Sequence, residues 1–558
     1  MPIREKIKEY VNKNNFTLGN LLDLNAEFFF DDEAVIINGH RKTWSNLYKD
    51  IMQFCSALHQ LGFKKEDKIA VWSQNRYEWI LAWFALLKLG IIIIPMDHWY
   101  RPEESRYILN HSDSIAIICT SDYLDQIVSD RCDYYPNLTS IIVMDQISNK
   151  YKNTPDIYSM KELMENDENY DIKVLNKIQD SLDRFDTAFF LYTSGTTGTP
   201  KGAQLSHYSI IKNMIYTSEN MKNTHDDKMV IPVPFSHVFG NVVGITLACI
   251  TGTTMIPLRD QNPKVALETV MRERATILHG TPTHFIRYIK EKEQHPEWNL
   301  SCMRTGIIAG APCPPETMKG IIEILKMPEI IIGYGMTELS PFCTMTSPED
   351  SFYYRTNSVG KSLPEMEIKI VDEKNNPVER GEKGEICVKG YNVMNGYYKS
   401  PEKTRDAIDK DGFMHTGDLG IVDEKGYYKI VGRKKDMIIY GGFNIYPVMI
   451  EEYLLNHPNI IEVAVVGVPD PEYGEVVAAV AKVNDGITEQ NLVDYCYGNI
   501  SSPSVPRYVL FGVELPLSGR GKVQKFKLRE ILTNMLEEGK LGPKIIPTLV
   551  QARATIKK

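Results

Sequence analysis

Short runs of β-branched and other apolar residues recur along the first 330 positions, and each is followed by a turn and a segment with helical spacing. The runs cover 68–72, 114–119, 187–192, 229–233, 275–278, 306–309 and 329–332. Strand-like runs that alternate with helical patterns are typical of parallel sheets covered by helices. The pattern therefore predicts an α/β fold. In open α/β sheets, ligands bind beyond the carboxyl ends of the strands, so polar residues just after these runs are candidates for a site.

The C-terminal part of the chain has a different pattern of residues. From about Gly384 onward, glycine- and aspartate-rich turns separate short strand-like runs. The pattern then predicts strands over 460–468, 476–483 and 508–513 and a helix over 489–497. This mixture, in a segment of roughly 100 residues, predicts a separate small α+β domain.

Two apolar stretches, 80–96 and 242–258, come closest to a membrane span. The first contains Lys88 and Gly90, and threonine, glycine and cysteine dilute the second. A spanning helix needs about 20 consecutive apolar residues, so we expect both stretches to form buried core. Residues 1–15 lack the apolar run of a secretory signal, and their glutamates argue against a transit peptide. We therefore predict a cytoplasmic protein without a transmembrane segment.

Composition agrees with a folded intracellular protein. Of the 558 residues, 43% are hydrophobic and 24% are charged, which excludes disorder as the dominant state because such a chain can bury a large core. Nine cysteines without a CxxC pair indicate reduced thiols rather than a disulfide framework or a zinc site. The net charge of −9 argues against general nucleic-acid binding. Residues 501–558 nevertheless hold 11 basic and 4 acidic side chains, which suits them to polyanions.

The strongest chemical signal is the segment YTSGTTGTPKG, residues 192–202, directly after an apolar run. Its glycines allow the backbone to turn tightly and to approach phosphate oxygens. The hydroxyl groups of Ser194, Thr196, Thr197 and Thr199 are donors, and the Lys201 ammonium is a cation. Pro200 stands where a Walker A loop has its second glycine, so the segment predicts a polyphosphate cradle of another type.

This segment resembles the signature loop of the adenylate-forming superfamily, which includes acyl-CoA synthetases, coumarate–CoA ligases, nonribosomal-peptide adenylation domains and firefly luciferase. Further segments resemble the superfamily's motifs in order: PFSHVFG at 234–240, GAP at 310–312, GYGMTE at 333–338, TGD at 416–418, GRKKD at 432–436 and GK at 521–522. The resemblance covers about residues 15–535 and is strongest to the medium-chain fatty acyl-CoA synthetase branch.

The resemblance implies a ligase that joins a fatty acid to ATP, releases pyrophosphate and passes the acyl group from acyl-AMP to the thiol of CoA. It implies a catalytic set of Lys201, His237, Thr337, Glu338 and Lys522, with Glu338 as the Mg²⁺ ligand. Two anions must approach each other in the first step, and Mg²⁺ and fixed cations remove their repulsion. The implied nucleotide- and CoA-binding residues are Thr193, Ser194, Gly195, Thr196, Thr197, Gly198, Thr199, Pro200, Lys201, Gly310, Ala311, Pro312, Gly333, Tyr334, Gly335, Met336, Thr337, Asp418, Arg433, Lys435, Gly441, Gly442 and Lys522.

The resemblance also implies the domain organisation. Residues 1–433 would form a large N-terminal adenylation domain with several subdomains, and 434–540 a mobile lid that turns about a hinge at Lys435. Residues 541–558 would form a tail. Two positions depart from the medium-chain pattern: Ser504 replaces a basic residue near the nucleotide end of CoA, and Arg520 replaces a small residue beside the catalytic lysine.

Histidines need separate weighing. His237 lies between Phe235 and Phe239 and on its own is typical of a core residue, whereas the resemblance places it beside the substrate. There is no GxSxG or HExxH motif. His279 and His284 are too far apart to share one helical face, so we expect them to be structural.

The acyl site is only partly predictable. An apolar wall without a basic residue for a second carboxylate favours a monocarboxylic apolar acid; it consists of Phe235, Val238, Phe239, Val242, Val243, Ile245 and Leu247. Two alternatives remain open: an acyl-AMP ligase that loads a carrier protein, and a ligase for aryl or other acids. A scaffold that has lost its chemistry is disfavoured by the complete motif set. The expected partners are the acid, ATP and CoA, with a homodimer and peripheral membrane contact left open.

Overall fold

The computed structural model describes residues 2–152, 154–165, 171–193, 200–441, 443–517 and 523–548. The chain divides into two compact units, Met1–Ile368 with Val388–Met414, and Lys369–Cys387 with His415–Lys558. In the described residues, no helix is long and apolar enough to cross a membrane.

The first unit is built on two large mixed sheets. The nine-stranded sheet has the order β16-β15-β14-β13-β12-β10-β11-β1-β2. Its strands are β1 (Glu33–Ile37), β2 (His40–Thr43), β10 (Lys228–Ile231), β11 (Thr254–Pro257), β12 (Ile277–Leu278), β13 (Thr305–Ile308), β14 (Glu329–Gly335), β15 (Phe342–Met345) and β16 (Lys361–Ser362). The eight-stranded sheet has the order β19-β9-β8-β4-β3-β5-β6-β7. Its strands are β3 (Lys68–Trp72), β4 (Ile92–Met96), β5 (Ala116–Cys119), β6 (Ser140–Val143), β7 (Ile157–Ser159), β8 (Thr187–Thr193), β9 (Lys201–Ser206) and β19 (Gly396–Tyr397).

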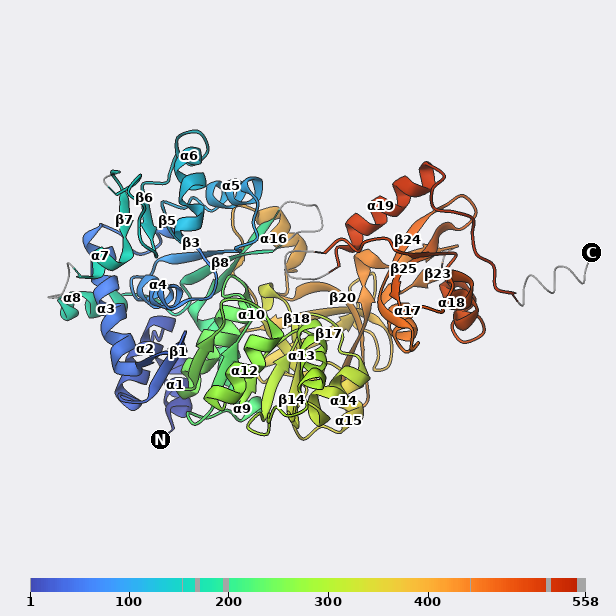
Figure 1. Ribbon diagram of the computed structural model, residues 1–558, viewed down its shortest axis with the longest axis horizontal. Helices are drawn as coiled ribbons and strands as arrows, with labels where there is room; N and C mark the ends of the chain where they lie inside the picture. Colours follow the sequence, from blue (N-terminus) through green and yellow to red (C-terminus); the bar gives the residue numbers. More distant parts are fainter. Residues whose placement is uncertain are drawn as a thin grey trace, which may run out of the picture. The chain divides into compact units, whose positions relative to one another are not determined.

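Helices connect and cover these sheets (Figure 1). They are α1 (Ile3–Lys13), α2 (Leu18–Phe28), α3 (Trp44–Gln60), α4 (Tyr77–Lys88), α5 (Pro102–His111), α6 (Leu124–Tyr134), α7 (Met160–Glu165), α8 (Ile172–Asp180), α9 (His207–Met221), α10 (Val238–Gly240), α11 (Leu247–Thr251), α12 (Pro263–Glu273), α13 (Pro282–Gln294), α14 (Pro315–Glu323), α15 (Phe352–Asn357) and α16 (Pro401–Ala407). Between α10 and α11 runs a π-helix, η2 (Asn241–Thr246), and the unit also contains the short 3₁₀ turns η1 (Ser121–Tyr123) and η3 (Thr337–Leu339). A further 3₁₀ turn, η4 (Lys434–Asp436), belongs to the second unit.

Burial agrees with the apolar pattern of the sequence. Helix α4 is buried from Trp79 to Lys88, and β4 is buried throughout. The stretch 242–258 forms the π-helix, α11 and β11 and is also buried. Both stretches are therefore core of the first unit, as predicted. The predicted α/β fold is confirmed, with strand ends that shift by one or two residues at several runs.

Two of the predicted strands are not followed by a helix. β8 pairs antiparallel with β9, from Thr187 opposite Ser206 to Thr193 opposite Lys201. β14 likewise pairs antiparallel with β15 after the 3₁₀ turn η3. The apolar run alone could not distinguish these cases, because the partner strand lies beyond a turn of small and polar residues.

The second unit contains a four-stranded sheet of order β17-β18-β20-β21 and a five-stranded sheet of order β23-β22-β25-β24 with β26 beside β25. Its strands, some of which begin or end in the first unit, are β17 (Met366–Val371), β18 (Gly384–Gly390), β20 (Met414–Val422), β21 (Tyr428–Arg433), β22 (Ile438–Tyr440), β23 (Phe443–Ile445), β24 (Ile460–Asp470), β25 (Gly474–Val483) and β26 (Tyr508–Phe511). Its helices are α17 (Pro447–Leu455), α18 (Glu489–Cys496), η5 (Ser502–Ser504) and α19 (Lys525–Glu537). The predicted C-terminal strands and helix are present, whereas the domain boundary at residue 433 stays a prediction.

Candidate active site

Helix α5 holds both ends of the predicted polyphosphate cradle, residues 192–202, called the phosphate-loop segment below. Tyr192, at the end of β8, shares a hydrogen bond of 2.8 Å with Nδ1 of His111. Tyr107 donates its hydroxyl to the carbonyl oxygen of Pro200 at 3.0 Å. Thr193 and Lys201 face each other across the β8–β9 pair. The loop residues between them, Ser194, Gly195, Thr196, Thr197, Gly198 and Thr199, lie outside the described residues.

The turn η3 brings Glu338 to this pair of strand ends. Glu338 is buried, with 5% of its side chain exposed. Its Oε1 accepts hydrogen bonds from the hydroxyl of Thr193 at 3.3 Å and from the hydroxyl of Tyr397 at 2.8 Å. The ammonium of Lys201 lies 4.9 Å from the centre of the Tyr397 ring. Thus three of the predicted residues, Thr193, Lys201 and Glu338, meet in one cluster.

Glycines and a buried amide shape the turn. A Cβ on Gly335 would overlap the carbonyl oxygen of Pro341, and one on Gly333 would lie 2.6 Å from the Phe342 ring. Asn213, on α9, donates to the carbonyl oxygen of Phe342 at 2.7 Å and accepts from its N–H at 3.3 Å. Strand β14, the turn and β15 pack this closely, so the backbone around Thr337 and Glu338 has little room to shift.

The other nucleotide-site candidates of the first unit follow neighbouring parallel strands. β13 and β14 pair in parallel, and Gly310, Ala311 and Pro312 come directly after β13 and are exposed. Gly310 has a φ of +88°, a conformation that glycine adopts without strain. Tyr334, Met336 and Thr337 follow at the end of β14 and are partly buried. Their position at the carboxyl ends of adjacent strands is where open α/β sheets bind ligands.

In the segment predicted to line the acyl site, His237 caps the amino end of the short helix α10. His237 is partly buried, and its Nδ1 accepts the N–H of Phe239 at 3.1 Å. All seven residues of the predicted apolar wall are buried. Gly240 is required here because a Cβ would overlap the carbonyl oxygen of Pro234. The π-helix that follows is a rare form that is frequent at functional sites.

The second unit contains the remaining candidates. Asp418 and Arg433 lie opposite each other in the β20–β21 pair, and their side chains form an ion pair of 2.9 Å. Asp418 is 6% exposed. Lys435 lies in the 3₁₀ turn η4 between β21 and β22, and Gly441 has a φ of +53°. Gly442 and Lys522 lie outside the described residues, as does Arg520.

The residues around Glu338 fit Mg²⁺. This ion typically binds one or two carboxylates and completes its octahedron with phosphate oxygens and water. Glu338 supplies a carboxylate beside the Thr193 hydroxyl and the strand ends that flank the phosphate-loop segment. Tyr397 donates to that carboxylate and so orients it. Glu338 is therefore the side chain that would hold the ion.

Comparison with known proteins identifies the family. The model of the AMP-binding enzyme family matches residues 22–398, and that of the AMP-binding enzyme C-terminal domain matches residues 449–522. The chain belongs to the AMP-binding enzyme family. The resemblance to acyl-CoA synthetases and the assignment to the ligases are thereby confirmed.

Named relatives of this AMP-binding enzyme span nearly its whole length. YngI of Bacillus subtilis (strain 168), named as an acyl-CoA synthetase, is 40% identical over 542 residues, which are 92% of this chain and 96% of YngI. The mitochondrial medium-chain acyl-CoA ligase ACSF2 of Bos taurus is 35% identical over 547 residues, 93% of this chain and 88% of the relative. Among solved structures, ATP-bound MatB from Rhodopseudomonas palustris has 28% identity and a TM-score of 0.81, covering 93% of this chain and 100% of MatB. The anthranilate CoA ligase AuaEII with anthranoyl-AMP, at 24% identity, has the same fold with a TM-score of 0.85 and covers 94% of this chain and 98% of AuaEII.

Sequence reasoning did not single out Tyr397 of this AMP-binding enzyme. Nothing in the segment NGYYKSPE indicates that this tyrosine lies beside Glu338 and Lys201, which precede it by 59 and 196 positions. The pairing of β19 with β9 brings it there, with Tyr397 opposite Ala203. A tyrosine within a glycine-containing turn is the one signal available, and many surface turns share it.

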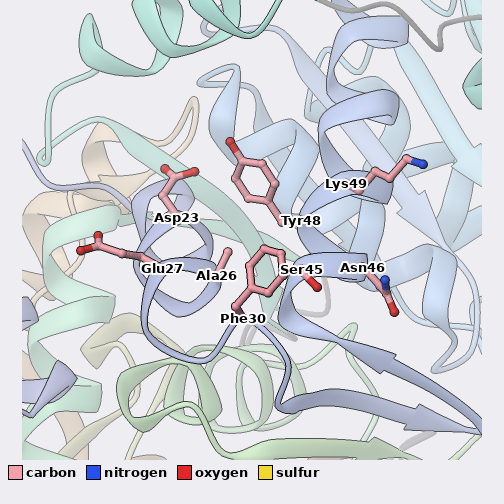
Figure 2. A pocket seen from close by; sticks show the side chains of 8 residues that line it. All are labelled: Asp23, Ala26, Glu27, Phe30, Ser45, Asn46, Tyr48 and Lys49. Carbon is pink, nitrogen blue, oxygen red and sulfur yellow. The ribbon is translucent and has the colours of Figure 1, made fainter.

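A pocket elsewhere in the first unit is separate from this cluster (Figure 2). It is lined by Asp23, Ala26 and Glu27 of α2, by Phe30, and by Ser45, Asn46, Tyr48 and Lys49 of α3. None of the described candidate residues of the AMP-binding site lines it. Asp23 at its wall forms an ion pair of 2.7 Å with the buried Lys88, which gives this carboxylate a structural role.

Proposed function

We propose that this AMP-binding enzyme is an ATP-dependent acyl-CoA synthetase for apolar monocarboxylic acids, with medium-chain fatty acids as its substrate class. The observation that carries the proposal is the cluster of Thr193, Lys201 and Glu338 at the ends of the strands that flank the phosphate-loop segment. The buried apolar wall at 235–247 supports an apolar acid. The relatives named medium-chain acyl-CoA ligases, which match 93% of the chain, support the chain-length class.

In the first half-reaction, a carboxylate oxygen of the acid attacks the α-phosphorus of ATP. The new P–O bond gives acyl-AMP, and the bond to the β-phosphate breaks so that pyrophosphate leaves. Lys201 holds the polyphosphate, Thr337 donates to the α-phosphate, and Lys522 contributes a point charge that offsets the repulsion of the two reacting anions. Glu338 would hold Mg²⁺, which would supply further positive charge at the phosphates.

Asp418 and Arg433 serve the nucleoside in this proposal. A carboxylate with two oxygens is suited to accept both ribose hydroxyls, and the Arg433 guanidinium at 2.9 Å orients it. Tyr334 offers a flat face to adenine, and His237 lies beside the acyl group. In the second half-reaction, the lid of residues 434–540 turns about Lys435, and Gly441 and Gly442 line the path of the CoA thiol. The thiol sulfur attacks the acyl carbonyl, and AMP leaves.

The test is an acid panel with both products measured. Enzyme, ATP, Mg²⁺ and CoA are incubated with straight-chain acids from C4 to C18 and with benzoate-type acids, and AMP and pyrophosphate are quantified. Equal amounts of AMP and pyrophosphate, with the highest kcat/KM for medium-chain acids, are expected. ADP as product, or no turnover with any acid, would overturn the proposal. Acyl transfer to a carrier protein but not to CoA would establish the carrier-loading alternative, and a preference for aryl acids the other one.

A further inference from the structure

Tyr397 is fixed at a junction between distant segments of the first unit. It ends the two-residue strand β19, which pairs with β9 just after Lys201. Its N–H donates to the hydroxyl of Thr404 at 2.9 Å, and 8% of the residue is exposed. Backbone pairing and burial therefore restrict the direction in which its side chain can point.

In that direction the side chain touches two residues of the proposed catalytic set. Its hydroxyl donates to Oε1 of Glu338 at 2.8 Å, and its ring lies under the Lys201 ammonium, 4.9 Å from centre to nitrogen. A cation at this distance from an aromatic face is attracted to it.

The two hydroxyl donors to Glu338 bind the same oxygen of its carboxylate. Within the part of the chain that the structure describes, Tyr397 and Thr193 both donate to Oε1. Oε2 is then the oxygen left for a ligand. A metal-binding carboxylate that is oriented by hydrogen bonds binds its ion more tightly, and loss of such a supporting partner typically reduces metal affinity about 10- to 100-fold.

We propose that Tyr397 is a positioning residue that orients the Glu338 carboxylate toward Mg²⁺ and holds Lys201 beside the phosphates. The inference deepens the proposed function and rests on it. A single side chain thereby couples the metal ligand to the phosphate-binding lysine, although the three residues come from three separate segments.

Tyr397→Phe tests the hydroxyl, and Tyr398→Phe is its matched control. The neighbouring Tyr398 also donates its hydroxyl to a carboxylate, that of Asp113, at 2.7 Å, but it touches neither Glu338 nor Lys201 among the described contacts. Isothermal titration calorimetry measures the affinity for MgATP and for ATP in EDTA. Tyr397→Phe should weaken MgATP binding about 10-fold or more and leave metal-free ATP within about twofold. Tyr398→Phe should leave both affinities within about twofold of wild type.

A second variant tests the ring. Tyr397→Leu should also weaken metal-free ATP, by about two- to fivefold, because Lys201 loses its aromatic support. If Tyr397→Phe does not fold, as judged by its melting temperature, Thr193→Val removes the other donor to Oε1 and should weaken MgATP selectively. The inference is overturned if Tyr397→Phe binds MgATP as Tyr398→Phe does, or if it weakens the binding of MgATP and of metal-free ATP equally. A wild-type enzyme that binds MgATP but activates no acid overturns the proposed function instead, so the two failures are distinguishable.

Discussion

The substitution Gly335→Ala tests how strictly the backbone of the Glu338 turn is determined. Gly335 ends β14, and the pairing with β15 shifts register at this point. An added Cβ would overlap the carbonyl oxygen of Pro341 and lie 3.0 Å from the Cα of Phe342, whereas ordinary contacts begin at 3.4 Å. These are backbone atoms, which cannot rotate away as a side chain can. The two strands must therefore move apart.

The size of the effect follows from that displacement. To restore an ordinary contact, the carbonyl oxygen of Pro341 has to move from 2.0 Å to 3.4 Å from the added Cβ, a displacement of about 1.4 Å. Thr337 and Glu338 lie in the turn between the two strands, so they move with it. A misplacement of about 1 Å in a catalytic constellation reduces the rate about 100-fold. Overpacking of this kind also lowers the free energy of unfolding by about 1–3 kcal/mol.

The assay is single-turnover release of pyrophosphate at saturating ATP and acid, with urea denaturation in parallel. Gly467→Ala, in the second unit, is the control, because its Cβ would meet side-chain atoms of Ile438 at 3.1 Å rather than backbone. We expect about a 100-fold slower first half-reaction for Gly335→Ala and little change for Gly467→Ala. A folded Gly335→Ala enzyme with a rate within twofold of wild type would refute the reasoning.

Three further predictions concern other parts of the chain. Lys522→Ala should abolish acyl-AMP formation and spare thioester formation from preformed acyl-AMP and CoA; equal loss of both halves would show that its proposed role is wrong. Asn213→Ala leaves the buried N–H of Phe342 without its acceptor, while the Phe342 carbonyl keeps the Asn392 amide at 3.2 Å. It should therefore lower the free energy of unfolding by about 1–3 kcal/mol, clearly more than Asn220→Ala, whose amide is partly exposed; equal losses would contradict this. Burial lowers the pKa of His207 to about 4, of His279 to about 3 and of His284 to about 4. Because the unfolded chain binds protons near its ordinary histidine pKa and the folded chain does not, the free energy of unfolding should fall as the pH drops from about 6.5 toward 4, by up to about 1.4 kcal/mol per pH unit for each histidine. His207→Gln should reduce the slope of the free energy of unfolding against pH by up to the contribution of one bound proton. An unchanged slope in urea titrations at pH 7, 6 and 5 would disprove the lowered pKa of His207.

The sequence predicted local features well because they depend on local patterns. The strand β3 was placed at its observed residues, and the apolar stretch around Lys88 was correctly assigned to the core. What could not be predicted was pairing across the chain. The return of β9 against β8, and of β15 against β14, depends on partners that follow polar turns and carry no distinctive period.

The same limit applies to the candidate site. The motif residues Thr193, Lys201 and Glu338 were found by their sequence context, and the fold brings them together. Tyr397 and Asn213 were missed because their importance lies in what they touch. Asn213 is a polar residue on a helix whose spacing indicates only burial, and its amide reaches a backbone 129 residues away.

The acyl site shows why an apolar sequence pattern is an incomplete guide to a substrate. The residues of the predicted wall are buried, but the same segment also buries polar atoms: in the described structure, Ser236 Oγ, Asn241 Oδ1 and Thr246 Oγ1 have no hydrogen-bond partner, and neither has Nε2 of His279, which follows β12. Nδ1 of His279 accepts the N–H of Ile307 at 2.9 Å, so its Nε2 carries the proton and is a donor. His279 also lies 6.0 Å from Phe239, ring centre to ring centre, which places this donor against the start of the predicted wall. Buried polar atoms in folded proteins are nearly always paired with protein groups or water. Either ordered water or a polar group of the acid completes these bonds, and an acid panel with 3-hydroxy and ω-hydroxy acids beside the plain chains distinguishes the two.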